Sequence, residues 1–81
     1  MNAIEIQKLI ESNISDSQAI VTTDDNVHFD AIVISNTFKN ITNRVAQQKL
    51  VYKALGNKIS NGEIHALQLK TYTQDKWDTI K

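Results

Sequence analysis

The chain has 81 residues, equal numbers of basic and acidic side chains (nine each) and no cysteine. This length corresponds to one domain with a modest core, and a hydrophobic fraction of 41% excludes a disordered chain. The lack of cysteine excludes disulfides and a nucleophilic thiol, and the balanced charge argues against a dedicated nucleic-acid domain, which is usually basic. No signal peptide or membrane-length apolar run is visible, so we expect a cytoplasmic protein without membrane association.

An amphipathic helix is predicted at the start of the chain, over residues 2–13. Apolar residues recur at the spacing of one helix face, as at Ile6 and Ile10. Asn2, with Glu5 three residues later, matches a capping box, in which each side chain bonds the backbone of the other residue. The pattern thus predicts both the helix and its N-terminal cap.

A β-hairpin is predicted next. Residues 18–23 and 27–34 are rich in β-favouring side chains, and His28-Phe29 stands near the start of the second segment. The link between them, Asp24-Asp25-Asn26, has the composition of a turn, and so short a polar link favours antiparallel pairing. A connector then covers residues 35–42, and we expect it to contain a helical turn anchored by Phe38.

The longest predicted helix covers about residues 44–60, with Thr42 or Asn43 as its cap. Its inner face is expected at steps of three and four residues. The residues that meet this spacing are Ile41, Val45, Gln48, Tyr52, Leu55 and Ile59, with Val51 widening the stripe. Residues 60–63 form a turn by composition and lead into the last predicted strand.

The most strand-like segment runs from Ile64 to Tyr72. Alternation places four of its residues on one face: His65, Leu67, Leu69 and Thr71. Because the other face also carries apolar residues, we expect a central strand, with His65 at its entrance, where the ring can contact the core and still reach solvent. Thr73 is expected to cap a short last helix, from which Trp77 folds back onto the domain.

Several strings within these elements resemble the BolA family. They are His28-Phe29, Phe38, Arg44-Val45, Val51-Tyr52 with Leu55, and above all the run from Ile64-His65-Ala66-Leu67 to Lys70-Thr71-Tyr72-Thr73, with Trp77 four residues later. The resemblance covers nearly the whole chain and is strongest to the acid-resistance-linked, IbaG/YrbA-like branch. It implies a single domain over residues 1–81 with an α+β fold of order α-β-β-α-β-α. This fold is like the type II KH domain, a three-stranded mixed sheet with helices on one face.

The same resemblance implies a partner and a shared cofactor. BolA-like proteins form heterodimers with monothiol, CGFS-type glutaredoxins and share a [2Fe-2S] cluster held by glutaredoxin cysteine, glutathione and histidine. The family's usual histidine ligand maps to His65, and a second ligand normally comes from the loop between the first two strands, where His28 is the nearest imidazole. We therefore expect a role in iron–sulfur cluster assembly, trafficking or iron regulation, with no cofactor bound to the isolated chain.

The histidines also have plainer interpretations. A single histidine beside an apolar strand is usually a packed or hydrogen-bonded structural residue, and His28 could simply cap the edge of the sheet. The pair could also hold Zn²⁺ with help from Asp24, Asp25 or Asp30, although structural zinc usually has four protein ligands.

The alternative function is a DNA-binding regulator of transcription or stress response. Four basic residues would carry that role: Lys39, Arg44, Lys49 and Lys70. A solvated surface is the competing interpretation. The GxxG loop with which KH domains grip nucleic acid cannot form, because the only glycines are Gly56 and Gly62. No catalytic triad or phosphate-binding loop is readable, so we do not expect an enzyme.

Overall fold

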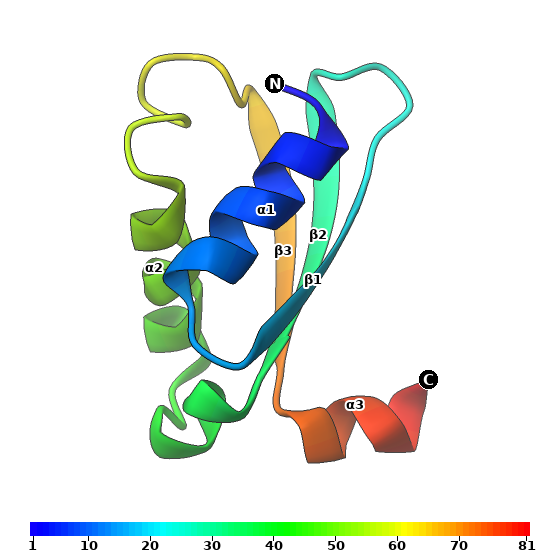
Figure 1. Ribbon diagram of the computed structural model, residues 1–81, viewed down its shortest axis with the longest axis vertical. Coiled ribbons are helices and arrows are strands. Elements are labelled where there is room, and N and C mark those ends of the chain that lie inside the picture. The colour runs from blue at the N-terminus through cyan, green and yellow to red at the C-terminus, as the bar shows by residue number, and fades with distance from the viewer.

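The computed structural model describes residues 1–81, and its elements follow the predicted α-β-β-α-β-α order (Figure 1). A short 3₁₀ helix, η1, occupies the connector that was expected to contain a helical turn. The elements are α1 (Ala3–Asn13), β1 (Ser17–Thr22), β2 (His28–Ser35), η1 (Asn36–Asn40), α2 (Arg44–Leu55), β3 (Ala66–Tyr72) and α3 (Gln74–Ile80). None of the helices is both long enough and apolar enough to cross a membrane.

The three strands form one mixed sheet in the order β1-β2-β3. β1 and β2 pair antiparallel, as the hairpin prediction required, and β3 pairs parallel to β2 from His28 opposite Ala66 to Ile34 opposite Tyr72. The expectation that the last strand is central was wrong: β2 is central and β3 is an edge. The hairpin already occupies one side of β2, so a strand returning through a helical crossover can pair only with its other side.

α1 and α2 cover one face of this sheet and enclose the core between them (Figure 1). Alternation along β2 sends Phe29 and Val33 to that face. They join buried side chains from both helices and from the segments that flank them. The core cluster consists of Ile6, Ile10, Ile14, Ala19, Phe29, Val33, Phe38, Val51, Leu55 and Ile64.

The N-terminus of α1 has the predicted cap. Asn2 Oδ1 accepts the backbone N–H of Glu5 at 2.9 Å, and Glu5 Oε1 accepts the backbone N–H of Asn2 at 3.2 Å. Both bonds are needed for a capping box, and each satisfies a backbone donor that the first helical turn leaves free.

α2 is shorter than predicted and ends at Leu55 instead of near residue 60. Its start is as expected, with Asn43 Oδ1 accepting the backbone N–H of Val45 at 2.8 Å. Its end falls at Gly56, whose φ of 63° and ψ of −129° turn the chain out of the helix. A residue with a side chain rarely adopts this conformation, so the glycine terminates the helix.

The inner face of α2 also differs from the prediction. Val51 and Leu55 are buried, but Val45 is 58% exposed and Tyr52 is 40% exposed. The inward stripe steps by four residues through Gln47, Val51 and Leu55, so the helix is rotated relative to the predicted face. The inward glutamine explains the error, because an apolar pattern assigns no inner position to a polar residue.

Gln47 connects α2 to the end of β3. Its Oε1 accepts a hydrogen bond from the hydroxyl of Thr71 at 2.6 Å, and its amide donates to the carbonyl of Ile41. Thr71 is only 4% exposed, so its hydroxyl would otherwise be buried without a partner. A buried polar group needs such a bond to avoid a desolvation cost of about 1–3 kcal/mol, and this pairing therefore sets the position of α2 over β3.

α3 lies at the far end of the sheet from the hairpin loop, against β2 and β3 (Figure 1). Thr73 caps it as predicted, accepting the backbone N–H of Lys76 at 3.2 Å. Trp77 does fold back, and its ring centroid lies 5.6 Å from that of Tyr72. By alternation Tyr72 is on the face opposite Thr71, so the contact with Trp77 places α3 toward that face. The core face is covered by α1 and α2 alone, and most of the other face is open.

Candidate functional site

His65 lies in the loop that joins α2 to β3, one residue before the strand begins. The prediction had placed it within the strand. The ring is exposed, and no hydrogen bond or ion pair within the chain engages either of its nitrogens; the only histidine ring with such a contact is that of His28. The backbone on both sides is held: Ile64 N–H donates to the Lys58 carbonyl at 3.0 Å, and Ala66 N–H donates to the Val27 carbonyl at 3.4 Å. A fixed backbone thus carries a free imidazole.

The loop before His65 is reinforced by an ion pair across its width. Lys58 Nζ lies 3.0 Å from Glu63 Oε2, and the side-chain amide of Asn61 donates to the same oxygen at 3.0 Å. The bond from Lys58, and after it that from Asn61, lowers the pKa of Glu63 below its ordinary value of 4.5. These contacts join the two sides of the loop that leads to His65.

An apolar hollow of about 350 Å³ adjoins the His65 ring. Its walls are Tyr52 from α2, Ile59 and Ile64 from the loop, and Leu67 from β3. Tyr52 and Ile59 were predicted to lie in the core, but they are 40% and 38% exposed here. Exposed apolar side chains gathered around a polar group are typical of a surface that contacts another molecule. The sequence did not reveal this hollow, since the residues come from three different segments.

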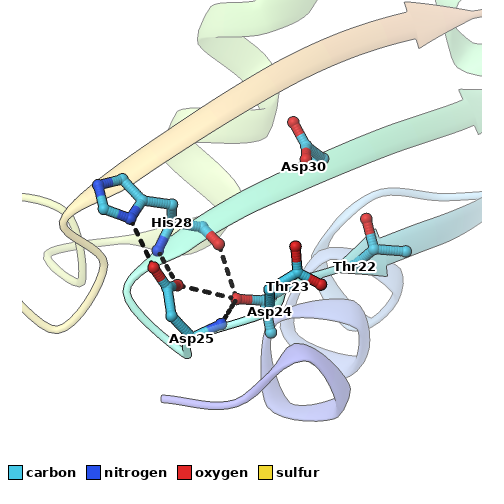
Figure 2. Close-up of a pocket in the computed structure, with 6 residues that line it drawn as sticks. All are labelled: Thr22, Thr23, Asp24, Asp25, His28 and Asp30. Atoms are coloured by element: carbon cyan, nitrogen blue, oxygen red, sulfur yellow. Dashed lines mark hydrogen bonds and ion pairs between the residues drawn. The ribbon is translucent and has the colours of Figure 1, made fainter.

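His28 is the first residue of β2, and 71% of its side chain is exposed. Unlike His65, it has a partner: its Nδ1 lies 2.8 Å from Asp25 Oδ2 (Figure 2). The ring lines a polar pocket of about 150 Å³ at the hairpin loop, together with Thr22, Thr23, Asp24, Asp25 and Asp30. Sequence analysis identified Asp25 only as a turn residue or as a helper in a zinc site.

Asp25 is the most strongly bonded carboxylate of the hairpin loop. It accepts the backbone N–H of His28, bonds the His28 ring and accepts the backbone N–H of Val27, in decreasing order of their effect on its pKa. Together these bonds hold the pKa of Asp25 well below its usual range, because each stabilises the ionised form. A hydrogen-bonded turn of this kind also closes the loop between the two strands.

The two histidines lie at the same end of the sheet but do not share a pocket. His28 pairs in register with Ala66, the residue directly after His65. Alternation directs His28 to the open face, whereas His65 shares its hollow with Leu67, which faces the helices. The chain brings together no group of three or more His, Cys, Asp or Glu side chains able to hold a metal ion. The predicted zinc site is therefore not supported.

The four basic residues of the alternative function are not gathered into one patch. Lys39, in η1, pairs with Asp75 of α3 at 3.5 Å. Arg44 and Lys49 are exposed on α2, whereas Lys70 is exposed on β3 and, by alternation, points away from the helix-covered face. The sheet thus separates Lys70 from the pair on α2.

These features define a class of protein: a small α+β domain with two exposed imidazoles at one end of a mixed sheet. A family model described as BolA-like protein matches residues 1–76. The chain belongs to the BolA family, which confirms the resemblance read from its motifs.

Individual relatives agree with this assignment. The chain is 33% identical over 73 residues to the acid stress protein IbaG of Escherichia coli K12, covering 90% of this chain and 84% of that protein. It is 42% identical over 77 residues to a protein of Haemophilus influenzae, covering 91% and 88%. The structure of a BolA homologue from Coxiella burnetii superposes with a TM-score of 0.84 at 37% identity, covering 96% of this chain and 97% of the other.

Proposed function

We propose that this chain is the partner of a monothiol, CGFS-type glutaredoxin and contributes His65 to a [2Fe-2S] cluster that the glutaredoxin and glutathione also hold. One observation carries the proposal: the His65 ring is exposed, and no hydrogen bond or ion pair within the chain engages its nitrogens. An exposed imidazole whose nitrogens have no partner within the chain can offer either lone pair to a metal. Membership in the BolA family supports the same reading.

The donor set of the chain supports a cluster that is shared with a partner. Iron–sulfur clusters are held mainly by thiolates, and this chain has no cysteine and no group of three metal-binding side chains. The remaining ligands must therefore come from the partner. Imidazole in place of thiolate raises the reduction potential of a cluster, which suits a centre that is assembled, passed on or used to sense iron.

The surface around His65 supports the docking of a protein. Tyr52 and Ile59 expose apolar area directly beside the ring, and the loop that carries the ring is held by the Lys58–Glu63 ion pair. A docked glutaredoxin would cover this apolar area at the same time as it brings the cluster to the imidazole. Burial of apolar surface would then add to the affinity at about 25 cal/mol per Å² before the costs of association.

The test is to mix the protein anaerobically with cluster-loaded monothiol glutaredoxin and to follow visible absorption and circular dichroism. We expect a new spectrum with the wild-type chain and none with His65→Ala. His65→Ala and His28→Ala each remove an exposed ring. We therefore expect the free energy of unfolding of each variant to lie within about 0.5 kcal/mol of that of the wild type. His28→Ala is measured beside His65→Ala, because loss of the second exposed imidazole shows whether His28 also contributes to the spectrum.

Two outcomes would count against the proposal. One is the absence of any spectral change when wild-type protein is added. The other is a spectrum that is the same with His65→Ala as with the wild type, which would mean that the partner binds without using this imidazole.

A further inference from the structure

Both oxygens of the Asp25 carboxylate are bonded to residues that follow it in the hairpin loop. Oδ1 accepts the backbone N–H groups of Val27 and His28, both at 2.9 Å, and Oδ2 lies 2.8 Å from Nδ1 of the His28 ring. Figure 2 shows the ring at the outer end of the pocket, with the carboxylate below one of its nitrogens. One side chain therefore holds both the backbone and the ring of His28.

This contact decides which nitrogen of the ring carries the proton. An ionised carboxylate can only accept hydrogen bonds, so His28 Nδ1 must be the donor. A neutral imidazole has a single N–H, and Nε2 therefore keeps its lone pair. No group of the chain bonds Nε2, and the side chain is 71% exposed. The nitrogen that faces solvent is thus the one able to bind a metal.

The rest of the loop holds Asp25 in place before anything binds. The Thr23 hydroxyl accepts the backbone N–H of Asn26 at 3.0 Å and donates to the His28 carbonyl at 2.7 Å. Asn26 has a φ of 60°, a left-handed conformation that asparagine tolerates better than most residues. These bonds close the loop on both sides of Asp25, so its carboxylate is already ordered beneath the ring.

We propose that Asp25 is a positioning residue for His28: it keeps the proton on Nδ1 and presents the Nε2 lone pair to a metal centre that another molecule brings. Only the identity of that centre as a [2Fe-2S] cluster rests on the function proposed above. Metal-binding histidines usually donate their second ring nitrogen to a carboxylate or a carbonyl, which fixes the tautomer and makes the binding nitrogen more basic. His65 has no such partner. The tautomer and orientation of the ring are therefore fixed in advance at His28 and not at His65.

The variant Asp25→Asn separates the two roles of this carboxylate, which are to accept the backbone N–H groups of the loop and to bond the His28 ring. The amide oxygen can still accept the two backbone N–H groups, but the NH₂ group that replaces Oδ2 is a donor, which Nδ1 can only meet as an acceptor. The proton of the His28 ring is then expected to move to Nε2. Asp24→Asn is the matched control, because it removes the same charge from the neighbouring residue, which makes no bond to the ring.

The tautomer is measured on the isolated, ¹⁵N-labelled protein by two-bond ¹H–¹⁵N correlation at a pH where the imidazole is neutral. We expect Nδ1–H at His28 in the wild type and in Asp24→Asn, and Nε2–H in Asp25→Asn. Backbone amide signals of Val27 and His28 report whether the loop keeps its shape. An Nε2–H tautomer in the wild type, or an unchanged tautomer in Asp25→Asn with the loop intact, would overturn the assignment.

Availability of the lone pair is measured with Cu²⁺ alone, which imidazole binds strongly. In a His65→Ala background His28 is the single imidazole, and broadening of its ring signals reports binding. We expect Asp25→Asn to weaken Cu²⁺ binding by about 10–100-fold and Asp24→Asn to change it little. Equal affinity for Cu²⁺ with and without Asp25→Asn in the His65→Ala background would refute the positioning role. Neither measurement needs glutaredoxin, so a wild-type chain that takes up no cluster would refute the proposed function without affecting this result.

Discussion

At the scale of single residues, the two histidines differ in what their rings contact. The His65 ring has no partner within the chain and adjoins an apolar hollow, whereas the His28 ring is bonded to Asp25 in a polar pocket. An imidazole without a partner can choose either nitrogen for a ligand, and an imidazole bonded through Nδ1 can offer only Nε2. His65 is thus an adaptable donor, and His28 is a donor whose orientation is set in advance.

The bonds to Asp25 predict how the hairpin loop responds to acid. The folded pKa of Asp25 is depressed below its ordinary value of 3.8, so the stabilisation from its ionised form is complete above that value. It is lost only as the pH falls through the lower folded pKa. We expect the amide signals of Val27 and His28 to move in a titration whose midpoint lies below 3.8.

Nuclear magnetic resonance of the backbone amides is the measurement, and Asp25→Asn is its control. The variant has no ionisable group at this position, so the two signals should lose that titration. A midpoint at or above the ordinary value in the wild type would show that the hydrogen bonds to the carboxylate do not persist in solution.

At the scale of elements, the segment between α2 and β3 is the part of the fold that presents His65. α2 stops at Leu55, and the chain then needs ten residues, 56–65, to return to the sheet. Two glycines with positive φ, Gly56 and Gly62, shape this return, and the ion pair of Lys58 with Glu63 closes it. If α2 continued to residue 60, the loop would be too short to turn in this way, and Tyr52 and Ile59 would lie on one continuous helix.

Gly56→Ala tests this account of the end of α2. A Cβ atom at this position would meet no other atom within 4 Å, so the only cost is the backbone conformation, at φ +63°. Such a conformation costs a residue with a side chain about 1–3 kcal/mol. We expect a loss of that size in urea unfolding followed by circular dichroism. Lys53→Ala, on an exposed position of the same helix, should change stability by less than about 0.5 kcal/mol.

The opposite result would be equally informative. A Gly56→Ala protein as stable as the wild type, or more stable, would mean that the helix can extend past Leu55 at no cost, as the periodicity of the sequence first predicted.

At the scale of the whole molecule, the charges are balanced and dispersed. The net charge is zero, and the basic residues Lys39 and Lys70 lie in different elements from Arg44 and Lys49. Lys39 is also partly neutralised by Asp75. Affinity for DNA depends on several cations that meet the phosphate backbone together. A dispersed set on both sides of a sheet cannot follow a duplex in this way.

We therefore expect the isolated protein to bind DNA at the non-specific level, with a dissociation constant of about 10⁻⁴–10⁻⁶ M at physiological salt. Fluorescence anisotropy with a labelled duplex at several salt concentrations is the measurement, and the double variant Arg44→Ala with Lys49→Ala is the comparison. Binding in the nanomolar range that this double variant abolishes would restore DNA recognition as a function of the fold.

Local chemistry alone determined the order of the elements and their boundaries at the caps. The capping box of Asn2 and Glu5, the polar link of the hairpin and the cap at Thr73 each involve groups within a few residues of one another, so a short stretch of sequence contains the whole interaction. The motifs around His65 were also enough to indicate the family, since they stand at fixed positions along the chain.

Only the tertiary structure decided which strand is central, which side of α2 faces inward and what surrounds each histidine. Gln47 points inward because Thr71, 24 residues away, needs a partner. β3 lies at an edge because the hairpin already occupies β1's side of β2. The hollow beside His65 joins side chains from α2, the following loop and β3. Each of these depends on contacts between segments distant in sequence, and the pattern within any one segment carries no record of its neighbours in space.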